Sequence, residues 1–218
     1  MIKACLFDLD GVIVDTAKYH YLAWKKMANA LGSDFSEQQN EQLKGVSRMD
    51  SLNLILKWGN INLNEEEKIK WAAQKNEWYL EFLQKMDASE ILPGVLTFIQ
   101  DLKQKNIKIG LGSSSKNAVL ALTKVGMLDY FETIIDGTKT TRSKPDPQVF
   151  QLGAAALNCQ PEECLVFEDA ESGIEAALAG GFYTVGMGSI ENLSHAHLVL
   201  ASLENVTIER IESKLNTL

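Results

Sequence analysis

Two aspartates near the N-terminus are spaced so that both could serve one chemical site. Asp8 and Asp10 follow an apolar run and, in extended backbone, would point to the same side. Asp169 can join them, and a set of carboxylates suits Mg²⁺ because this cation prefers oxygen ligands. Taken alone, the Asp8–Asp10 pair is equally compatible with a strand end whose two acids are solvated.

Other side chains that could bind a ligand or take part in catalysis also come directly after apolar runs or after the loops that follow them. Residues 113–116 are Ser-Ser-Ser-Lys, residues 143–146 are Ser-Lys-Pro-Asp, and residues 168–169 are Glu-Asp. In an open parallel sheet, ligands bind beyond the carboxyl ends of the strands. Such a sheet would bring these hydroxyls, acids and a lysine to the edge where Asp8 and Asp10 lie, which favours a shared site over a solvated strand end.

Short apolar runs predict the strands that must position these groups. We expect strands at residues 1–9, 107–112, 133–135, 165–167 and 183–186, with a weaker candidate at 198–200. Helical patterns lie between them at residues 94–104, 116–125, 147–157 and 172–179. This alternation predicts an α/β fold with a doubly wound parallel sheet, that is, a Rossmann-like core.

Residues 16–91 interrupt the alternation with helical patterns alone. We expect helices at residues 17–31, 36–44, 49–58 and 64–86, the second and fourth opened by caps at Ser36 and Asn64. The chain is therefore predicted to have two domains. Residues 1–15 and 92–218 would form the core domain, and residues 16–91 an inserted all-helical cap domain.

The composition narrows the classes of function. The 218 residues are 45% hydrophobic, enough to bury a core and a smaller second lobe. A net charge of −8 argues against a duplex nucleic-acid binder, although local basic clusters could hold a small phosphorylated ligand. No signal peptide or membrane-spanning run is visible, and the three cysteines indicate reduced thiols. We therefore expect a cytoplasmic monomer with neither a nucleic-acid nor a membrane partner.

Four ordered motifs resemble those of one enzyme superfamily. The chain reads FDLDGVIVDT at 7–16, SSSKN at 113–117, SKPDP at 143–147 and FEDAESG at 167–173. These are similar to the four motifs of the haloacid dehalogenase-like phosphotransferases, and the similarity runs from residue 1 to about residue 188. One large class of that superfamily places its cap between the first and second motifs, where the helical block lies here.

The resemblance implies a role for each core residue. Asp8 would be the nucleophile that accepts the phosphoryl group, and Asp10 the general acid and base. Lys144 and Ser113 would bind the phosphoryl group. One Mg²⁺ would be held by Asp8, the Asp10 backbone carbonyl, Glu168 and Asp169. Dehalogenases of the superfamily lack the second acid and its ion pumps carry Thr there, so Asp10 favours a phosphotransferase.

The cap block resembles that of the β-phosphoglucomutases. These enzymes interconvert β-glucose 1-phosphate and glucose 6-phosphate through β-glucose 1,6-bisphosphate. The resemblance lies in the LKGVSRxDS segment at 43–51, in the helix before it, in SSSKN, and in a cap lysine. The implied substrate-binding residues are Thr16, His20, Trp24, Lys44, Gly45, Val46, Ser47, Arg48, Ser51, Lys75, Ser114, Ser115, Lys116 and Asn117.

A bisphosphate needs two cationic sites, and the resemblance supplies a second one. Arg48, with Lys116 and Asn117, would hold the phosphate that is not being transferred. A sugar-phosphate phosphatase strictly needs only the first site, so it stays the alternative to the mutase. A non-catalytic phosphosugar-binding module is a third reading, which the second acid disfavours because binding alone does not require it.

Several positions keep a second interpretation. Lys44 and Arg48 could be exposed cations of a solvated turn, and His20 could simply pack beside an aromatic ring. The resemblance instead pairs His20 with Lys75 and Asp10. Ser114 replaces the family's Ala, and residues 140–142 add two threonines and an arginine before the third motif, which leaves the identity of the sugar open.

Overall fold

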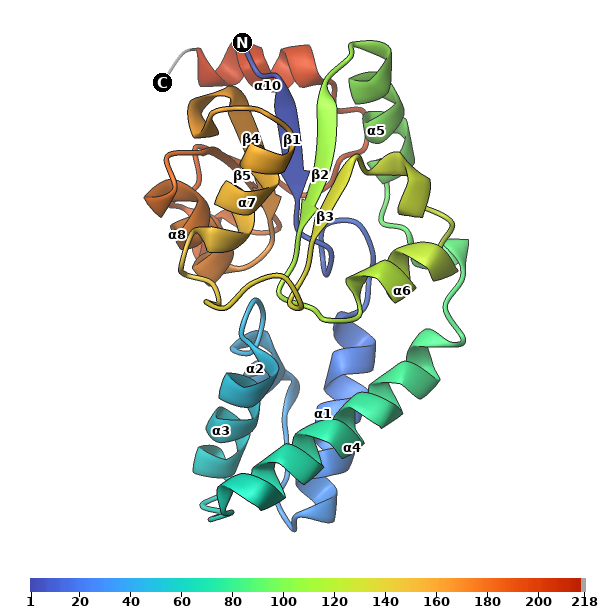
Figure 1. Cartoon of the computed structure of the whole chain (residues 1–218), viewed down its shortest axis with the longest axis vertical. Helices are drawn as coiled ribbons and strands as arrows, with labels where there is room; N and C mark the ends of the chain where they lie inside the picture. The colour runs from blue at the N-terminus through green and yellow to red at the C-terminus, as the bar shows by residue number, and fades with distance from the viewer. Residues whose placement is uncertain (217–218) are drawn as a thin grey trace.

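One parallel sheet forms the framework of the molecule (Figure 1). The computed structural model describes residues 1–216. The strands are β1 (Ala4–Phe7), β2 (Lys108–Gly112), β3 (Thr133–Ile135), β4 (Cys164–Glu168), β5 (Tyr183–Met187) and β6 (Leu198–Leu200). They pair in parallel in the order β3-β2-β1-β4-β5-β6, which confirms the predicted doubly wound sheet.

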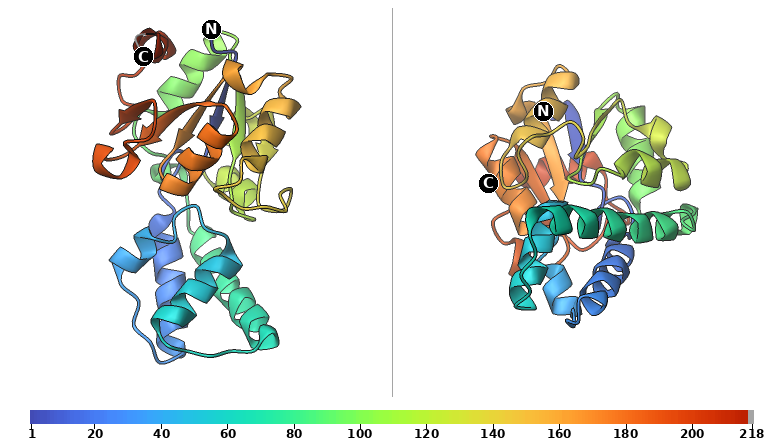
Figure 2. Two further views of the ribbon diagram at one scale, coloured as in Figure 1. Left: turned by 90° about the vertical axis from the view of Figure 1, so that its left-hand side faces the viewer. Right: turned by 60° about the horizontal axis from the view of Figure 1, so that its bottom comes forward.

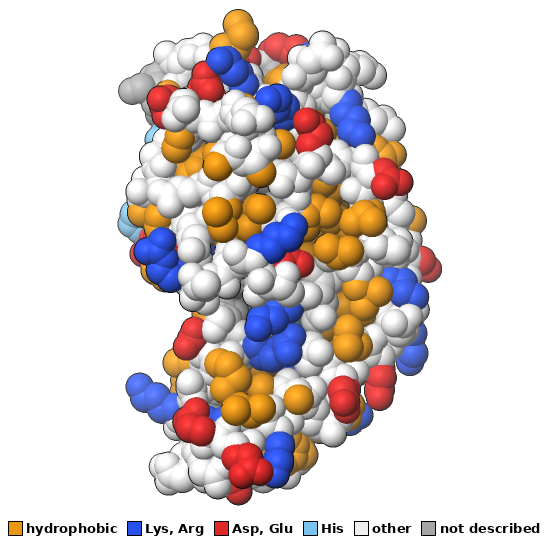
Figure 3. All heavy atoms as spheres, in the orientation of Figure 1, with side chains coloured by type: hydrophobic (Ala, Val, Ile, Leu, Met, Phe, Trp, Pro, Cys, Tyr) orange, Lys and Arg blue, Asp and Glu red, His pale blue; other side chains and the backbone are white. Residues whose placement is uncertain are grey.

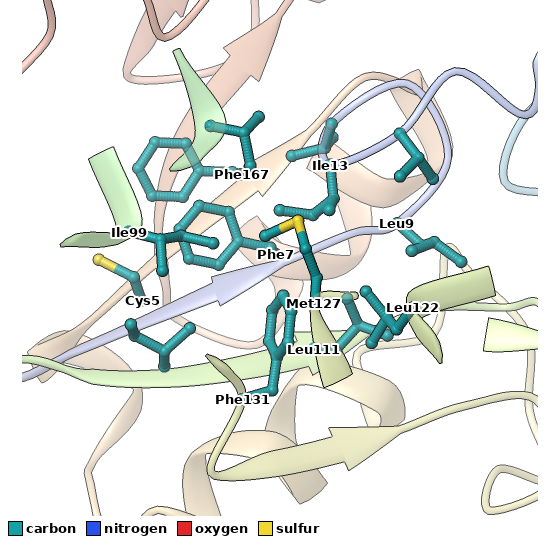
Figure 4. Close-up of a cluster of buried hydrophobic side chains, with 14 of the residues drawn as sticks. Cys5, Phe7, Leu9, Ile13, Ile99, Leu111, Leu122, Met127, Phe131 and Phe167 are labelled. Carbon is teal, nitrogen blue, oxygen red and sulfur yellow. The ribbon is translucent and has the colours of Figure 1, made fainter. Parts of the chain in front are cut away.

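Helices cover both faces of the sheet, because side chains alternate along each buried strand. Cys5 and Phe7 of β1 pack with side chains of α5 (Val95–Gln104), α6 (Ala118–Lys124) and α10 (Ile208–Leu215), and part of this cluster is drawn in Figure 4. Ala4 and Leu6 face the other way, toward α7 (Gln148–Ala156) and α8 (Glu171–Ala179). The sheet is therefore buried on both sides, as its continuous apolar strands predict.

Four helices form a separate block beyond the carboxyl ends of the strands (Figures 1 and 2). They are α1 (Ala17–Ala30), α2 (Glu37–Glu41), α3 (Arg48–Trp58) and α4 (Glu65–Leu83). Trp24, Phe35, Leu52 and Ala72 belong to a hydrophobic cluster contained within this block. The predicted boundaries at 15/16 and 91/92 stay a prediction, and the last two residues of the predicted core domain lie outside the described residues.

Two of these helices end earlier than predicted. After α2, the backbone N–H of Lys44 bonds to the carbonyl of Glu41, and after α4 that of Met86 bonds to Leu83, so both segments turn more tightly than an α-helix. Gly45 then adopts a φ of +71°, which a helix cannot accommodate. Elements not predicted are α9 (Ile190–Leu193), α10, and the 3₁₀ turns Ala88–Glu90, Leu128–Tyr130 and Pro161–Glu163.

The two chain segments that connect the sheet to the helical block are hydrogen-bonded to each other. The N–H of Asp15 donates to the carbonyl of Glu90 at 3.0 Å. The Glu90 carboxylate accepts from Lys18 at 2.6 Å and from the Tyr19 hydroxyl at 2.5 Å. Within residues 1–216, none of the helices combines the length and the apolar character needed to cross a membrane.

Candidate active site

Asp8 lies at the carboxyl end of β1 and is held by a buried lysine. The Lys144 ammonium is 2.5 Å from Asp8 Oδ1 and 2.8 Å from Glu168 Oε2. The N–H of Asp10 donates to Asp8 Oδ2 at 3.0 Å. Burial disfavours the Lys144 ammonium, but the two carboxylates outweigh it and raise the pKa of Lys144 above its ordinary value. This lysine therefore stays charged beside the predicted nucleophile.

The acids at this edge are arranged to hold a divalent cation. Asp8, Glu168 and Asp169 each offer an oxygen, and these oxygens lie within 4.8 Å of one another. Burial raises the pKa of Glu168 to about 8 and that of Asp169 to about 6. The negative charge of Asp8 acts in the same direction, and the positive charges of Lys144 and Lys44 offset these effects only in part. Hard oxygen ligands without His or Cys fit Mg²⁺.

Gly11 lets the chain after β1 approach this acid cluster closely. Its φ is +77°, and a Cβ there would lie 2.3 Å from Asp169 Oδ2. A side chain at this position would push the carboxylate away from Asp8. The glycine in the first motif is therefore required by both backbone conformation and space.

Asp10 occupies a different environment from Asp8. Its carboxylate accepts a hydrogen bond from the Thr16 hydroxyl at the start of α1. Burial raises the pKa of Asp10 to about 8, and the negative charges of Asp8 and Asp169 act in the same direction. A carboxyl group with such a pKa can release and take up a proton near neutral pH, as a general acid and base must.

A cavity of about 270 Å³ lies between the acid cluster and the helical block. Figure 3 shows lysine and arginine side chains in the middle of the visible face, at the level where the two parts meet. All the predicted substrate-binding residues except Thr16 line the cavity, and so do Asp8, Asp10, Ser113 and Asp169. Segments more than 100 residues apart in sequence therefore share one enclosed space.

The predicted second cationic site is assembled through a residue that sequence reasoning missed. Arg48 Nη2 donates to Asn76 Oδ1 at 2.7 Å, and Asn117 Nδ2 donates to the same oxygen at 2.9 Å. Arg48 begins α3, Asn76 lies on α4, and Asn117 precedes α6. Lys116 lines the same cavity. One amide oxygen thus joins the helical block to the sheet unit beside two cations.

Lys44 is placed apart from Arg48. Its ammonium lies 3.3 Å from Asp169 Oδ2 and 2.9 Å from Glu41 Oε2, at the acid cluster. The carbonyl of Gly45 accepts from the Ser114 hydroxyl at 3.3 Å. The loop that holds both residues is therefore packed onto the sheet unit and is not a solvated turn.

His20 forms one of the two pairings expected of it. Its Nδ1 lies 3.1 Å from Lys75 Nζ, whereas the Asp10 carboxylate accepts from Thr16 instead. Burial and the positive charges of Lys75 and Arg48 hold the pKa of His20 well below its ordinary value. His20 is thus a neutral partner for a buried lysine.

Further residues that line the cavity were not predicted. They are Ala17, Asn40, Asn76, Tyr79 and Gly137. Leu43, Thr140, Thr141 and Ser143, which lie in or beside the motifs but were given no binding role, line the cavity as well. Tyr79 follows Lys75 by four residues, a helical spacing that could have identified it. Asn76 gives no such signal, because an asparagine on a long polar helix is typical of a solvated face.

Comparison with known proteins identifies the class to which this fold and site belong. A family model described as haloacid dehalogenase-like hydrolase matches residues 2–181. The chain belongs to the haloacid dehalogenase-like hydrolase family.

Within that family, the chain is similar to β-phosphoglucomutases. It is 40% identical over 215 residues to "Beta-phosphoglucomutase" of Bacillus subtilis (strain 168), covering 98% of this chain and 95% of the relative. A crystal structure of β-phosphoglucomutase from Clostridium difficile matches with a TM-score of 0.95 at 44% identity, over 100% of this chain and 98% of that one. A "Phosphorylated carbohydrates phosphatase" of Thermotoga maritima is 28% identical over 220 residues, covering 100% of this chain and 98% of the relative.

Proposed function

We propose that the protein is a β-phosphoglucomutase, an isomerase that interconverts β-glucose 1-phosphate and glucose 6-phosphate. The observation that carries the proposal is the cluster of Arg48, Asn76 and Asn117 in the same cavity as Asp8. A bisphosphate intermediate carries about twice the charge of one phosphate. It therefore needs this second polar site as well as the first.

In this proposal, Asp8 is the nucleophile. One of its carboxylate oxygens attacks the phosphorus of β-glucose 1,6-bisphosphate, and the bond from phosphorus to the sugar oxygen breaks. Asp10 gives its proton to that sugar oxygen, which leaves a sugar monophosphate and an aspartyl phosphate. Transfer from the 1-oxygen releases glucose 6-phosphate. A molecule of β-glucose 1-phosphate then binds, Asp10 removes the proton from its 6-hydroxyl, and that oxygen attacks the phosphorus of the aspartyl phosphate, which frees the Asp8 carboxylate and re-forms β-glucose 1,6-bisphosphate. The bisphosphate turns over in the cavity, so that its 1-phosphate faces Asp8 in the next cycle.

The other residues of the acid cluster prepare Asp8 for this reaction. Lys144, charged and 2.5 Å from Asp8, offsets the repulsion between the carboxylate and a phosphate. The Ser113 hydroxyl would donate to a phosphate oxygen. Asp8, Glu168 and Asp169 would hold Mg²⁺, which supplies neutralising positive charge to the phosphoryl group when bound.

A phosphatase is the second candidate, because a phosphatase relative matches the chain over its full length. In that case water, not sugar, would take the phosphoryl group from Asp8. The second polar site argues for the mutase, because a phosphatase strictly needs only the site at which the phosphoryl group is transferred.

A coupled assay separates the two candidates. Purified protein is given β-glucose 1-phosphate, Mg²⁺ and a dehydrogenase that reports glucose 6-phosphate, with and without a trace of β-glucose 1,6-bisphosphate. A mutase produces glucose 6-phosphate, and the primer shortens the lag. A phosphatase releases inorganic phosphate and shows no response to the primer.

We further propose that the enzyme works as a cytoplasmic monomer and that residues 16–91 form its cap domain. Three buried cysteines without disulfides, Cys5, Cys159 and Cys164, are compatible with a reducing compartment. The cavity lies within a single chain, so the proposed chemistry requires no second copy.

A further inference from the structure

Lys75 is a buried lysine, and a buried lysine usually has an acidic partner. It lies on α4, lines the cavity, and is 2% exposed. A buried ammonium is costly unless other groups replace the water around it. Within residues 1–216, however, no carboxylate forms a hydrogen bond or an ion pair with the Lys75 ammonium.

Two aromatic rings and an imidazole surround this ammonium instead. Lys75 Nζ lies 4.2 Å from the centre of the Trp24 ring and 4.9 Å from that of Tyr79. His20 Nδ1 is 3.1 Å away. The face of an aromatic ring carries partial negative charge and attracts a cation at these distances. The rings come from α1 and α4, so the cage joins the two longest helices of the block.

We infer that Trp24 and Tyr79 are positioning residues whose rings hold the Lys75 ammonium, charged and unneutralised, at the cavity wall that faces the phosphorylated substrate. This inference deepens the proposed function and rests on it, because the positive charge of Lys75 would attract the anionic sugar phosphate. A carboxylate partner would stabilise Lys75 equally well, but it would cancel the positive charge that the cavity presents. An aromatic face stabilises the cation without adding a net negative charge.

The charges around Lys75 show why the rings are needed. Arg48 from α3 and His20 from α1 face it, as does Asp10 from the loop after β1. Burial and the charge of Arg48 hold the pKa of Lys75 well below its ordinary value, whereas Asp10 acts in the opposite direction. A protonated Lys75 must donate to His20 Nδ1, which requires His20 to be neutral with its proton on Nε2. The low pKa of His20 agrees with this arrangement.

The contribution of the Tyr79 ring can be distinguished from that of its hydroxyl. The hydroxyl oxygen is buried, it makes no hydrogen bond to Lys75 or His20, and the polar side chain that acts on it is Thr16. The Tyr79 ring contacts that of His20 in a tilted arrangement, with the centroids 4.1 Å apart and the planes at 36°. The hydroxyl therefore contributes little to the cage, and Tyr79→Phe should preserve what Tyr79→Leu destroys.

The test measures the protonation of Lys75 directly and the mutase reaction separately. The pKa of Lys75 is followed by NMR of side-chain-labelled lysine, assigned with Lys75→Arg. We expect Lys75 to be protonated at pH 7 in the unmodified protein. Its pKa should fall by about 1 in Trp24→Leu and in Tyr79→Leu, a tenfold change in protonation. Tyr79→Phe should leave the pKa unchanged, and 3,4,5-trifluorophenylalanine at position 79, which keeps the shape but removes the ring's negative face, should lower it.

Mutase activity is measured in the same variants and in one matched control variant. In the leucine variants, kcat/KM for β-glucose 1-phosphate should fall at least tenfold while hydrolysis of acetyl phosphate, which needs no cap contact, persists. Tyr21→Leu is the control, because Lys25 lies 5.1 Å from the Tyr21 ring outside the cavity, and this variant should keep the mutase rate.

Two results would overturn the inference. One is a Lys75 that is neutral at pH 7 in the unmodified protein. The other is a Lys75 pKa that does not respond to the ring series. The protein could also show no mutase reaction while the pKa of Lys75 changes among the ring variants as expected. That result would refute the proposed function but support the aromatic cage.

Discussion

The Arg48 guanidinium donates a 2.7 Å hydrogen bond to the side-chain carbonyl of Asn76. Arg48 is the first residue of α3 and Asn76 lies on α4, so the contact orients the guanidinium by bonding it to a neighbouring helix. An amide oxygen accepts from Arg as a phosphate oxygen does, but without the negative charge. A phosphate entering the cavity would therefore offer Arg48 a stronger acceptor than the one it leaves.

Arg48→Ala should damage the mutase reaction far more than the hydrolysis of acetyl phosphate. Arg48 would touch only the phosphate that is not transferred, and losing that contact should cost about 1.5–3 kcal/mol, roughly tenfold to a few hundredfold. Acetyl phosphate has no second phosphate, so its hydrolysis should stay near the normal rate. Both activities are measured on one preparation. Equal losses would place Arg48 in the chemical step or in the fold.

Asn76→Asp should weaken the binding of glucose 6-phosphate without unfolding the protein. The change keeps the shape and the acceptor but adds a negative charge beside the bound phosphate. We expect KM to rise at least about tenfold, equivalent to 1.4 kcal/mol, with acetyl phosphate hydrolysis retained. Steady-state kinetics with both substrates measures the effect. An unchanged KM would show that the distal phosphate binds elsewhere.

Asp8→Asn should abolish turnover while the fold persists. An amide is not a nucleophile for phosphorus, so the rate should fall by about a thousandfold or more. Mass spectrometry after incubation with acetyl phosphate should show a phosphoryl adduct on the unmodified protein and none on the variant. A variant that turned over near the normal rate, with its amide confirmed intact, would move the nucleophile away from Asp8.

The metal-free protein should become less stable as the pH rises from about 5 to 8. Folding raises the pKa of Asp10 and Glu168 to about 8 and that of Asp169 to about 6. Unfolded carboxyl groups release their protons near pH 4, so the folded protein binds more protons throughout this window. The free energy of unfolding should therefore fall by about 1.4 kcal/mol per pH unit for each retained proton. Below about pH 6.5, His20 offsets part of this fall, because folding lowers its pKa.

Thermal unfolding in EDTA at several pH values measures this slope. Added Mg²⁺ should flatten it, because the cation replaces the protons, and it should also restore the activity that EDTA removes. Asp10→Asn should be less pH-dependent than the unmodified protein because it has one fewer titrating acid. A metal-free protein whose stability is constant or rises over this window would contradict the proposed charge balance.

Much of the sheet unit could be predicted because its strands are short, mainly apolar runs, and the first five are each followed by a glycine, a hydroxyl or an acid. The location of the site could be predicted from the same pattern, because parallel strands place Asp8, Ser113 and Glu168 at one edge of the sheet. The helix α10 was missed because its apolar residues, Ile208 and Ile211 among them, are few and lie in a charged tail.

The contacts made across the cavity could not be predicted, because they depend on how helices far apart in sequence pack together. Nothing in the local sequence shows that Asn76 reaches both Arg48 and Asn117. The aromatic cage around Lys75 likewise needs Trp24 from another helix. The placement of Lys44 on Asp169 also follows from the fold of the loop that contains Gly45 and not from its composition.

The most direct test of the central claim is to follow β-glucose 1-phosphate by phosphorus NMR in the presence of Mg²⁺ and a trace of β-glucose 1,6-bisphosphate. The account predicts that the substrate signal is replaced by that of glucose 6-phosphate, with little inorganic phosphate. Stoichiometric release of inorganic phosphate, at a rate unaffected by the bisphosphate, would contradict it and identify a phosphatase.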